Sequence, residues 1–284
     1  MTTGDKLVLG VAQFSMSDKP QENIACAVDM VRQAHARGAS VVLLPELFAT
    51  RYFPREMDDK HFALAHPVAD DPSVRSLAQV ARELGVAIPV SFFERDGDAY
   101  YNSLVMLDER GQSLGVYRKT HIPDGTGYEE KFYFRPGDTG FTAFDTRAGR
   151  VGAGICWDQW FPECARAMAL LGADVLLYPT AIGSEPVTTR DTAAPWRRAM
   201  VGHAVSNTVY VAAANRVGSE GGQVFYGTSF IADPWGEIVA ELGRGEEGVL
   251  VAELDLARAR QDREWMGLLK DRQPGAYGEL VKRR

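Results

Sequence analysis

The chain has 284 residues, of which 45% are hydrophobic and 24% charged, so it can bury a large core and lacks the composition of a disordered segment. Its formal charge of −7 offers no basic surface for nucleic acid or anionic lipid, and we expect neither as a partner. Because no linker rich in Ser, Gly or Pro divides the chain, we expect one large α/β domain.

Cysteine use and the lengths of the apolar runs bear on location. Cys26, Cys156 and Cys164 are an odd number in a long chain and form no dense disulfide framework, which indicates a reducing cytoplasm. The first residues hold only a short apolar run, and no stretch approaches the roughly 20 apolar residues of a membrane span. We therefore predict a cytoplasmic protein without a signal peptide or membrane anchor.

The first predicted unit is a strand, a helix and a second strand. An apolar run predicts a strand over 6–14, helical spacing predicts a helix over 20–37 that ends at Gly38, and a strand over 40–44 leads directly to Pro45 and Glu46. This order is typical of a layered α/β fold.

A similar unit recurs later in the chain. It has a strand over 151–155 with Cys156 at its end, a helix over 162–171 and a strand over 174–178. The sequence around this last strand resembles that around the strand at 40–44, which suggests two similar layered halves.

Further strands are predicted between and after these units, joined by turn residues. They cover residues 86–93, 100–107, 112–117, 208–214, 228–232, 237–242 and 248–254. So many strands with only about four long helices imply mixed sheets that pack on each other and are covered by helices outside. The charged segment from Leu256 is expected to be an exposed arm or to dock on a partner subunit, which predicts a domain over 1–255 and an arm over 256–284.

Cys156 is the candidate nucleophile because it stands between a predicted strand and a predicted helix. Such a turn directs backbone N–H groups toward the side chain, which favours a thiolate and can hold an oxyanion. A buried structural thiol is the alternative, and the local pattern leaves the two about even. Cys26 and Cys164 lie within predicted helices and are expected to be packing thiols.

A thiol nucleophile needs a base, and a carboxylate is the better candidate here. His203 is the only histidine after Cys156, and its position does not suit a hydrolase of the nucleophile, acid, histidine order. Glu46 directly follows an apolar strand, where a carboxylate is costly unless something compensates it. Lys119 follows the strand over 112–117 in the same way. A salt bridge at the strand end and a solvated lysine are the plain alternatives.

The shared position of these three residues at strand ends favours the catalytic interpretation. Glu46, Lys119 and Cys156 all follow predicted strands, and open α/β sheets place ligands at the carboxyl ends of their strands. A carboxylate, an ammonium and a thiol at one edge make a complete acyl-transfer site.

Three segments that contain these residues carry a family resemblance. Segments 44–48, 117–123 and 154–163 resemble, in that order, the three motifs of the nitrilase superfamily, and the resemblance extends over almost the whole chain. It implies a four-layer α-β-β-α sandwich and a homo-oligomer built from dimers through helix and tail contacts. It also implies that no metal or organic cofactor is needed, in agreement with the lack of a Cys/His cluster with zinc spacing.

Within that superfamily, segments 127–134, 180–186 and 265–272 resemble the group that hydrolyses N-carbamoylputrescine. The resemblance implies a small carbamoyl amine as substrate, with putrescine, carbon dioxide and ammonia as products. It also implies that Glu130 is a second, supporting glutamate, although the adjacent Glu129 leaves that alignment open.

Loop residues after the strands are candidates for binding such a substrate. Glu185 and Asp124 follow strands by short loops, and either could bind a protonated amine, although loop carboxylates are ordinarily just solvated. The apolar stem could lie against aromatic side chains, for which we predict Tyr52, Tyr128 and Trp157.

Three alternatives remain open. An amidase of the same superfamily that acts on a β-ureido acid or an ω-amide would need a cation for the substrate carboxylate. A non-catalytic binding protein of the same fold would be expected to have lost the Cys, Lys or Glu, and none is lost. An acyltransferase would need an acceptor amine that outcompetes water.

Overall fold

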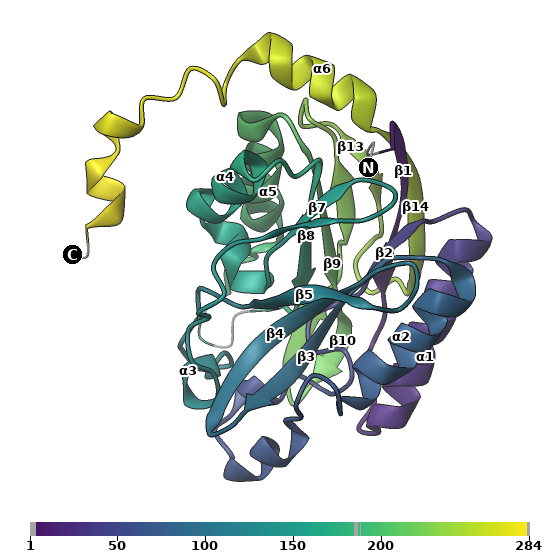
Figure 1. The fold of residues 1–284 in the computed structure, drawn as a ribbon. Helices are drawn as coiled ribbons and strands as arrows, with labels where there is room; N and C mark the ends of the chain where they lie inside the picture. The colour runs from purple at the N-terminus through teal and green to yellow at the C-terminus, as the bar shows by residue number, and fades with distance from the viewer. Residues whose placement is uncertain (1–3, 185–186, 188, 283–284) are drawn as a thin grey trace.

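The computed structural model describes residues 4–184, 187 and 189–282. Two layers of β-sheet pack face to face, and helices cover the outside of each layer (Figure 1). One layer is a six-stranded sheet of order β13-β12-β9-β8-β7-β6. The other is formed by two three-stranded sheets, β14-β1-β2 and β3-β4-β5, which are linked by a bridge between Val41 and Ala87. The predicted four-layer α-β-β-α sandwich is therefore confirmed.

The first layer contains most of the N-terminal half of the chain. Its elements are β1 (Lys6–Gln13), α1 (Pro20–Ala36), β2 (Val41–Leu43), α2 (Pro72–Leu84), β3 (Ile88–Asp96), β4 (Ala99–Leu107) and β5 (Ser113–Arg118), with β14 (Gly248–Asp255) returning to pair with β1. Helix α2 begins after Asp71, whose side chain accepts the N–H groups of Ser73 and Val74, and it ends at Gly85 in the left-handed conformation.

The second layer contains parallel strands with helical crossings. Its elements are β6 (Ala143–Asp145), β7 (Arg150–Ala153), α4 (Pro162–Leu170), β8 (Val175–Thr180), α5 (Ala193–Asn207), β9 (Tyr210–Asn215), β12 (Phe230–Ala232) and β13 (Ile238–Glu241). Strands β7, β8 and β9 are parallel and buried on both faces, which explains their almost continuous apolar sequence. A separate hairpin, β10 (Val217–Glu220) and β11 (Gln223–Tyr226), follows β9.

Alternation along the strands separates the three largest hydrophobic clusters of the core. Leu9 and Val11 of β1 and Leu177 of β8 belong to the cluster between the two sheet layers. Ala12 of β1 belongs instead to the cluster under α1 and α2, and Tyr178 of β8 to the cluster under α4 and α5. The site described below lies where the carboxyl ends of strands from both layers meet.

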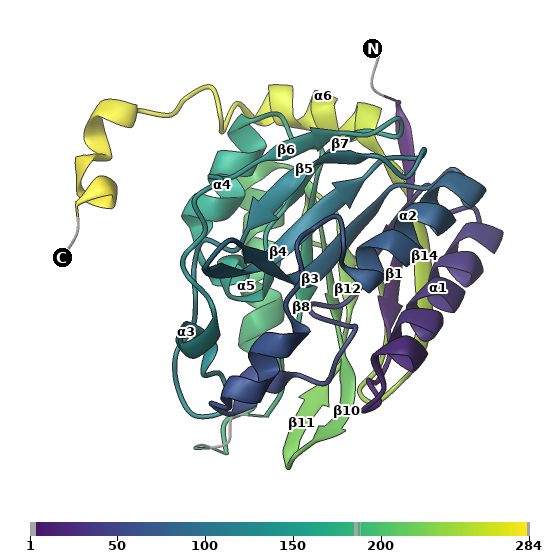
Figure 2. The ribbon, with the colours of Figure 1, turned by 60° about the horizontal axis from the view of Figure 1, so that its bottom comes forward.

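The C-terminal segment has two parts. Helix α6 (Leu256–Met266) packs back on the body of the chain, with Leu256 and Ala259 buried and Arg260 bound to Asp174 at 2.7 Å. Leu269 just after it packs against the cluster under α4 and α5, and the chain from there to residue 282 runs away from the sheets (Figures 1 and 2). The division into a domain and an arm at residue 255 stays a prediction.

Helix lengths, thiols and acidic clusters give three further facts. No described helix combines the length and the apolarity needed to cross a membrane. All three cysteines are free. Among the described residues no group of three or more His, Cys, Asp and Glu side chains is arranged to hold a metal ion, and the expectation of no metal stays a prediction.

Candidate active site

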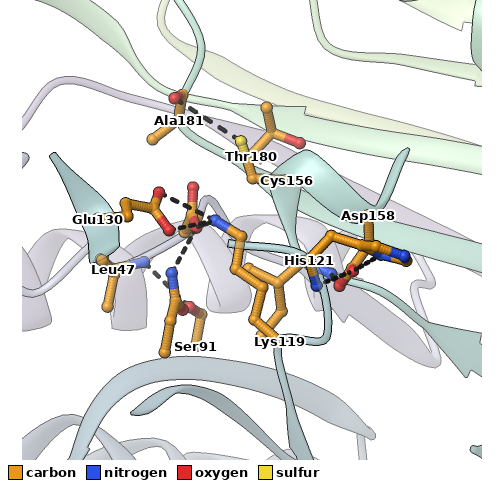
Figure 3. A network of polar contacts seen from close by, with 12 residues as sticks. Leu47, Ser91, Lys119, His121, Glu130, Cys156, Asp158, Thr180 and Ala181 are labelled. Atoms are coloured by element: carbon orange, nitrogen blue, oxygen red, sulfur yellow. Dashed lines mark hydrogen bonds and ion pairs between the residues drawn. The ribbon is translucent and has the colours of Figure 1, made fainter. Parts of the chain in front are cut away.

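Three strand ends from the two layers bring the predicted carboxylate, lysine and thiol together, and Figure 3 shows Lys119 and Cys156 from close by. Glu46 follows β2, Lys119 directly follows β5 and Cys156 follows β7. Glu46 and Lys119 have no exposed surface, and Cys156 is 5% exposed. The site therefore excludes bulk water, which strengthens every charge interaction inside it.

Lys119 lies between two carboxylates. Its Nζ donates to Glu46 Oε1 at 2.9 Å and to both Glu130 oxygens at 2.9 and 2.7 Å. Asn102 also donates to Glu46 Oε1, at 2.7 Å, and the Tyr52 hydroxyl donates to Glu130 Oε1 at 2.5 Å. Glu129 is only partly buried, so the supporting glutamate in this arrangement is Glu130.

The charges of this group fix the protonation of the lysine. Burial by itself lowers the pKa of Lys119, but the carboxylates of Glu130 and Glu46 outweigh it and raise the pKa above its usual range. Burial raises the pKa of Glu130 to about 7, opposed by the Lys119 ammonium and assisted by Glu46. The two carboxylates therefore favour the ammonium form of Lys119.

The second oxygen of Glu46 has no hydrogen-bond partner among the described residues, although it is buried. Oε1 of the same carboxylate accepts from both Lys119 and Asn102. A buried carboxylate oxygen without a donor is costly in a structural role. It is suited to accept a proton from a substrate or a nucleophile.

Cys156 has a backbone conformation that few non-glycine residues adopt. Its φ is +41°, and it begins the short 3-10 turn Cys156–Trp160. The first N–H groups of a helical turn have no partner within the turn, so the Trp157 N–H can point at a developing oxyanion. The thiol lies 3.8 Å from the carbonyl oxygen of Ala181, to which it can donate.

Burial and neighbouring charges both act on the pKa of the Cys156 thiol. The turn was expected to favour a thiolate, but burial raises the pKa of the thiol well above its usual value, and the Glu46 carboxylate raises it further. Lys119 opposes this only in part. These surroundings therefore favour the thiol form of Cys156 over the thiolate.

Asp158 ties the loop after β5 to the turn after β7. Its Oδ2 accepts from the Ile155 N–H at 2.9 Å and from the Tyr117 hydroxyl at 2.7 Å. Its Oδ1 accepts from the backbone N–H of His121 at 3.0 Å and lies 2.7 Å from Nδ1 of that ring, which stacks on Phe161. Asp158 thus fixes the loop that carries Lys119 relative to the turn that carries Cys156.

The predicted substrate-binding residues fall in different places. The Tyr52 and Tyr128 rings meet edge to face at 5.8 Å, and Tyr128 accepts a hydrogen bond from the Gly183 N–H at 3.1 Å. Trp157 is 40% exposed, and the Asp124 side chain is half exposed, 3.9 Å from the Lys131 ammonium. Neither belongs to the buried cluster, and Glu185 lies outside the described residues.

Several polar residues of the site escaped sequence reasoning. They are Asn102, Asp158, Arg216 and Glu220. Asn102 interrupts the apolar residues of a predicted strand, and Arg216 follows the predicted strand over 208–214, which is the signal that identified Glu46. The sequence therefore signals a polar residue in or just after an apolar strand, but it does not show which residue that side chain contacts.

Glu130 should make stability depend on pH near neutrality. Its pKa of about 7 in the folded chain is above that of an exposed glutamate, so its stabilising contribution is present at low pH and is lost as pH rises through 7. The stability advantage of the wild type over Glu130→Gln should thus fall by about 1 kcal/mol between about pH 6 and about pH 8. Urea unfolding of both proteins measures this, and an advantage that grows with pH would contradict the charge arrangement.

The chain is similar in sequence to known hydrolases of carbon–nitrogen bonds. The family model for carbon-nitrogen hydrolases matches residues 9–264. The chain is 49% identical to N-carbamoylputrescine amidase of Arabidopsis thaliana, with 97% of this chain and 95% of that protein covered. It is 46% identical to citrullinase of Francisella tularensis, with 97% and 98% covered.

A solved structure adds chemical information about a relative. It is a glutamate-to-glutamine mutant of the amidase from Nesterenkonia sp. AN1, in which the acetamide moiety of fluoroacetamide is attached to the active-site cysteine. The two chains superpose with a TM-score of 0.81 at 28% identity, and 98% of this chain and 97% of that one are covered. The expectation drawn from the three motifs is confirmed, and this chain is a member of the carbon-nitrogen hydrolase family, within the nitrilase superfamily.

Proposed function

We propose that the chain hydrolyses N-carbamoylputrescine to putrescine, carbon dioxide and ammonia, with Cys156 as the nucleophile and Glu46 as the base. Family membership and the similarity to N-carbamoylputrescine amidases support the reaction class. The observation that carries the residue roles is the buried Oε2 of Glu46 without a hydrogen-bond partner among the described residues, in a site that favours the thiol form of Cys156 and the ammonium form of Lys119.

In the first half-reaction Glu46 takes the proton of the Cys156 thiol, and the sulfur attacks the carbamoyl carbon. Negative charge that develops on the carbamoyl oxygen is stabilised by the Lys119 ammonium and the Trp157 N–H. The tetrahedral intermediate collapses by breaking the bond to the terminal nitrogen. Glu46 returns its proton to that nitrogen, ammonia leaves, and an S-carbamoyl group remains on Cys156.

In the second half-reaction Glu46 accepts a proton from water, and the hydroxyl attacks the same carbon. The carbon–sulfur bond breaks, the thiol recovers its proton, and a carbamate leaves. The carbamate then decomposes to putrescine and carbon dioxide without help from the protein. Glu130 supports both steps by holding Lys119 in place through its two hydrogen bonds.

Recognition of the distal ammonium of the substrate is assigned to an acidic loop residue. Glu185 comes four residues after Ala181 in the sequence, and the carbonyl oxygen of Ala181 lies 3.8 Å from the Cys156 thiol. The rings of Tyr52 and Tyr128 meet edge to face, and a four-carbon stem could lie against them. Asp124 is the weaker candidate because its side chain is half exposed.

Ammonia release from a panel of ureido compounds and ω-amides tests this proposal. N-carbamoylputrescine should be preferred over an uncharged carbamoyl alkane of equal length, and Glu185→Gln should weaken its turnover by roughly 10-fold to 100-fold. Turnover of the alkane by the same variant should change little. Asp124→Asn serves as the matched control. Equal losses on both substrates would remove the assignment of Glu185, and a wild-type preference for carbamoyl acids would remove putrescine as the product.

The similarity to citrullinase supports a second candidate, hydrolysis of a ureido amino acid. A β-ureido acid or an ω-amide would be related rivals. All three carry a carboxylate that calls for a cation in the pocket. The same panel distinguishes them, because each would then be turned over faster than N-carbamoylputrescine.

We further propose a cytoplasmic homo-oligomer built from dimers. Three free cysteines suit a reducing compartment. Large apolar side chains are exposed on the C-terminal segment and on α4, among them Trp265, Leu280, Val281, Leu170 and Leu171. Such side chains are typical of a covered surface. Sedimentation of the full chain tests this, and a monomer at all concentrations would contradict it.

A further inference from the structure

A second buried ion pair lies behind the candidate active site, outside the cluster of Glu46, Lys119 and Glu130. Arg216 stands between β9 and β10 and has no exposed surface, and Glu220 at the end of β10 is 2% exposed. Arg216 Nη1 donates to Glu220 Oε1 at 3.0 Å. Neither residue has a role in the reaction proposed above.

Both Nη atoms of Arg216 also donate to the segment that carries the base. Nη2 donates to the carbonyl oxygens of Glu46 at 2.6 Å and Leu47 at 3.2 Å, and Nη1 donates to that of Thr50 at 3.2 Å. Leu47 has a φ of +46°, a strained conformation for a residue with a side chain. The guanidinium therefore holds the backbone where it turns sharply after Glu46.

Glu220 in turn holds a second residue of the site, Tyr52, in place. Its Oε2 accepts the backbone N–H of Tyr52 at 2.5 Å. The Tyr52 hydroxyl in turn donates to Glu130, which binds Lys119. The ion pair is thus one end of a continuous chain of hydrogen bonds that reaches the lysine.

We propose that Arg216 and Glu220 are positioning residues for the reaction, which set the place of the Glu46 carboxylate and of Tyr52. Burial of an ion pair contributes little net stability, because the cost of removing two charges from water offsets their attraction. A fork of donors on successive backbone carbonyls, by contrast, fixes geometry closely. The pair therefore acts on the rate of the chemical step through Glu46.

Arg216→Lys tests this proposal, which rests on the proposed roles of Glu46 and Cys156. Lysine keeps the charge beside Glu220 but lacks the planar fork of donors with which the guanidinium reaches successive carbonyls. We expect kcat for ammonia release to fall by about 30-fold with KM within about threefold, since a misplacement of about 1 Å can cost about 100-fold. Glu220→Gln keeps the size of the side chain and an acceptor for Tyr52, and its kcat should fall by about 10-fold.

Arg260→Lys is the matched control. Arg260 also binds a buried carboxylate, Asp174, but does so under α6, away from the site. It should lower the melting temperature and leave kcat within about twofold. Unchanged kcat in both Arg216→Lys and Glu220→Gln, whatever happens to their melting temperatures, would overturn the proposal, as would a raised KM with unchanged kcat.

A readout that needs no substrate separates this proposal from the proposed function. Fluoroacetamide should modify Cys156 about tenfold more slowly in Arg216→Lys than in the wild type, because the base that takes the thiol proton is displaced. If the wild type released ammonia from no compound of the panel, the substrate assignment would fail. A slower modification in Arg216→Lys would still support the positioning role, and an equal rate would overturn it.

Discussion

Replacement of Cys156 by alanine will lower the rate of ammonia release by at least about 10⁴-fold, because no covalent intermediate can then form. The side chain is small and already packed beside the Ala181 carbonyl, so the loss of one sulfur atom should leave the fold intact. Steady-state ammonia release and the melting temperature of the variant measure the two effects separately. The loss should appear in kcat, since the substrate is held by other residues.

Cys164→Ala is the matched control for this variant. Cys164 is also a buried thiol with a raised pKa, but it lies in α4 under the second sheet. It should keep nearly full activity. Retention of more than about 1% of wild-type turnover by Cys156→Ala, in a preparation free of wild-type protein, would reject nucleophilic catalysis by this residue.

Removal of the Lys119 charge should damage both stability and activity. Lys119→Met leaves the carboxylates of Glu46 and Glu130 together in a buried site without their shared cation. Loss of one partner of a buried ion pair costs about 3–5 kcal/mol, and loss of an oxyanion donor costs about 10²-fold to 10³-fold in rate. Urea unfolding and ammonia release measure the two effects.

The double variant Lys119→Met/Glu130→Gln tells the two effects apart. It removes opposite charges together, so at least half of the lost stability should return, while activity should stay at the level of the single variant. Recovery of activity along with stability would show that Lys119 serves only to neutralise the site. Full activity of Lys119→Met itself would exclude the lysine from the reaction.

The sequence predicted the layered fold because its main signals are local. Apolar runs that end at Glu46, Lys119 and Cys156 identified the strands, and the carboxyl ends of strands meet at one edge. Helix α5 was not placed, because its buried stripe includes His203 and Asn207 and therefore lacks a clear apolar period. Helix α2 has a clear period and a capping aspartate, so it could have been predicted.

The contacts that complete the site could not be predicted from the sequence. The position of Asn102 on a strand was visible, but the face it occupies depends on the register between β4 and its neighbours. Arg216 and Glu46 meet only because the two halves of the chain pack together. The raised pKa of Cys156 has the same origin, since it comes from burial and from carboxylates on other strands.

Fluoroacetamide provides the most direct test of the central claim, that Cys156 is a nucleophile whose proton is taken by Glu46. Attack of the sulfur on the carbon that bears fluorine forms a carbon–sulfur bond and releases fluoride. Peptide mapping by mass spectrometry should find one acetamide moiety, on Cys156, in the wild type and more slowly in Glu46→Gln. Labelling of Cys26 or Cys164 with Cys156 unmodified, in a preparation that still releases ammonia, would contradict the account.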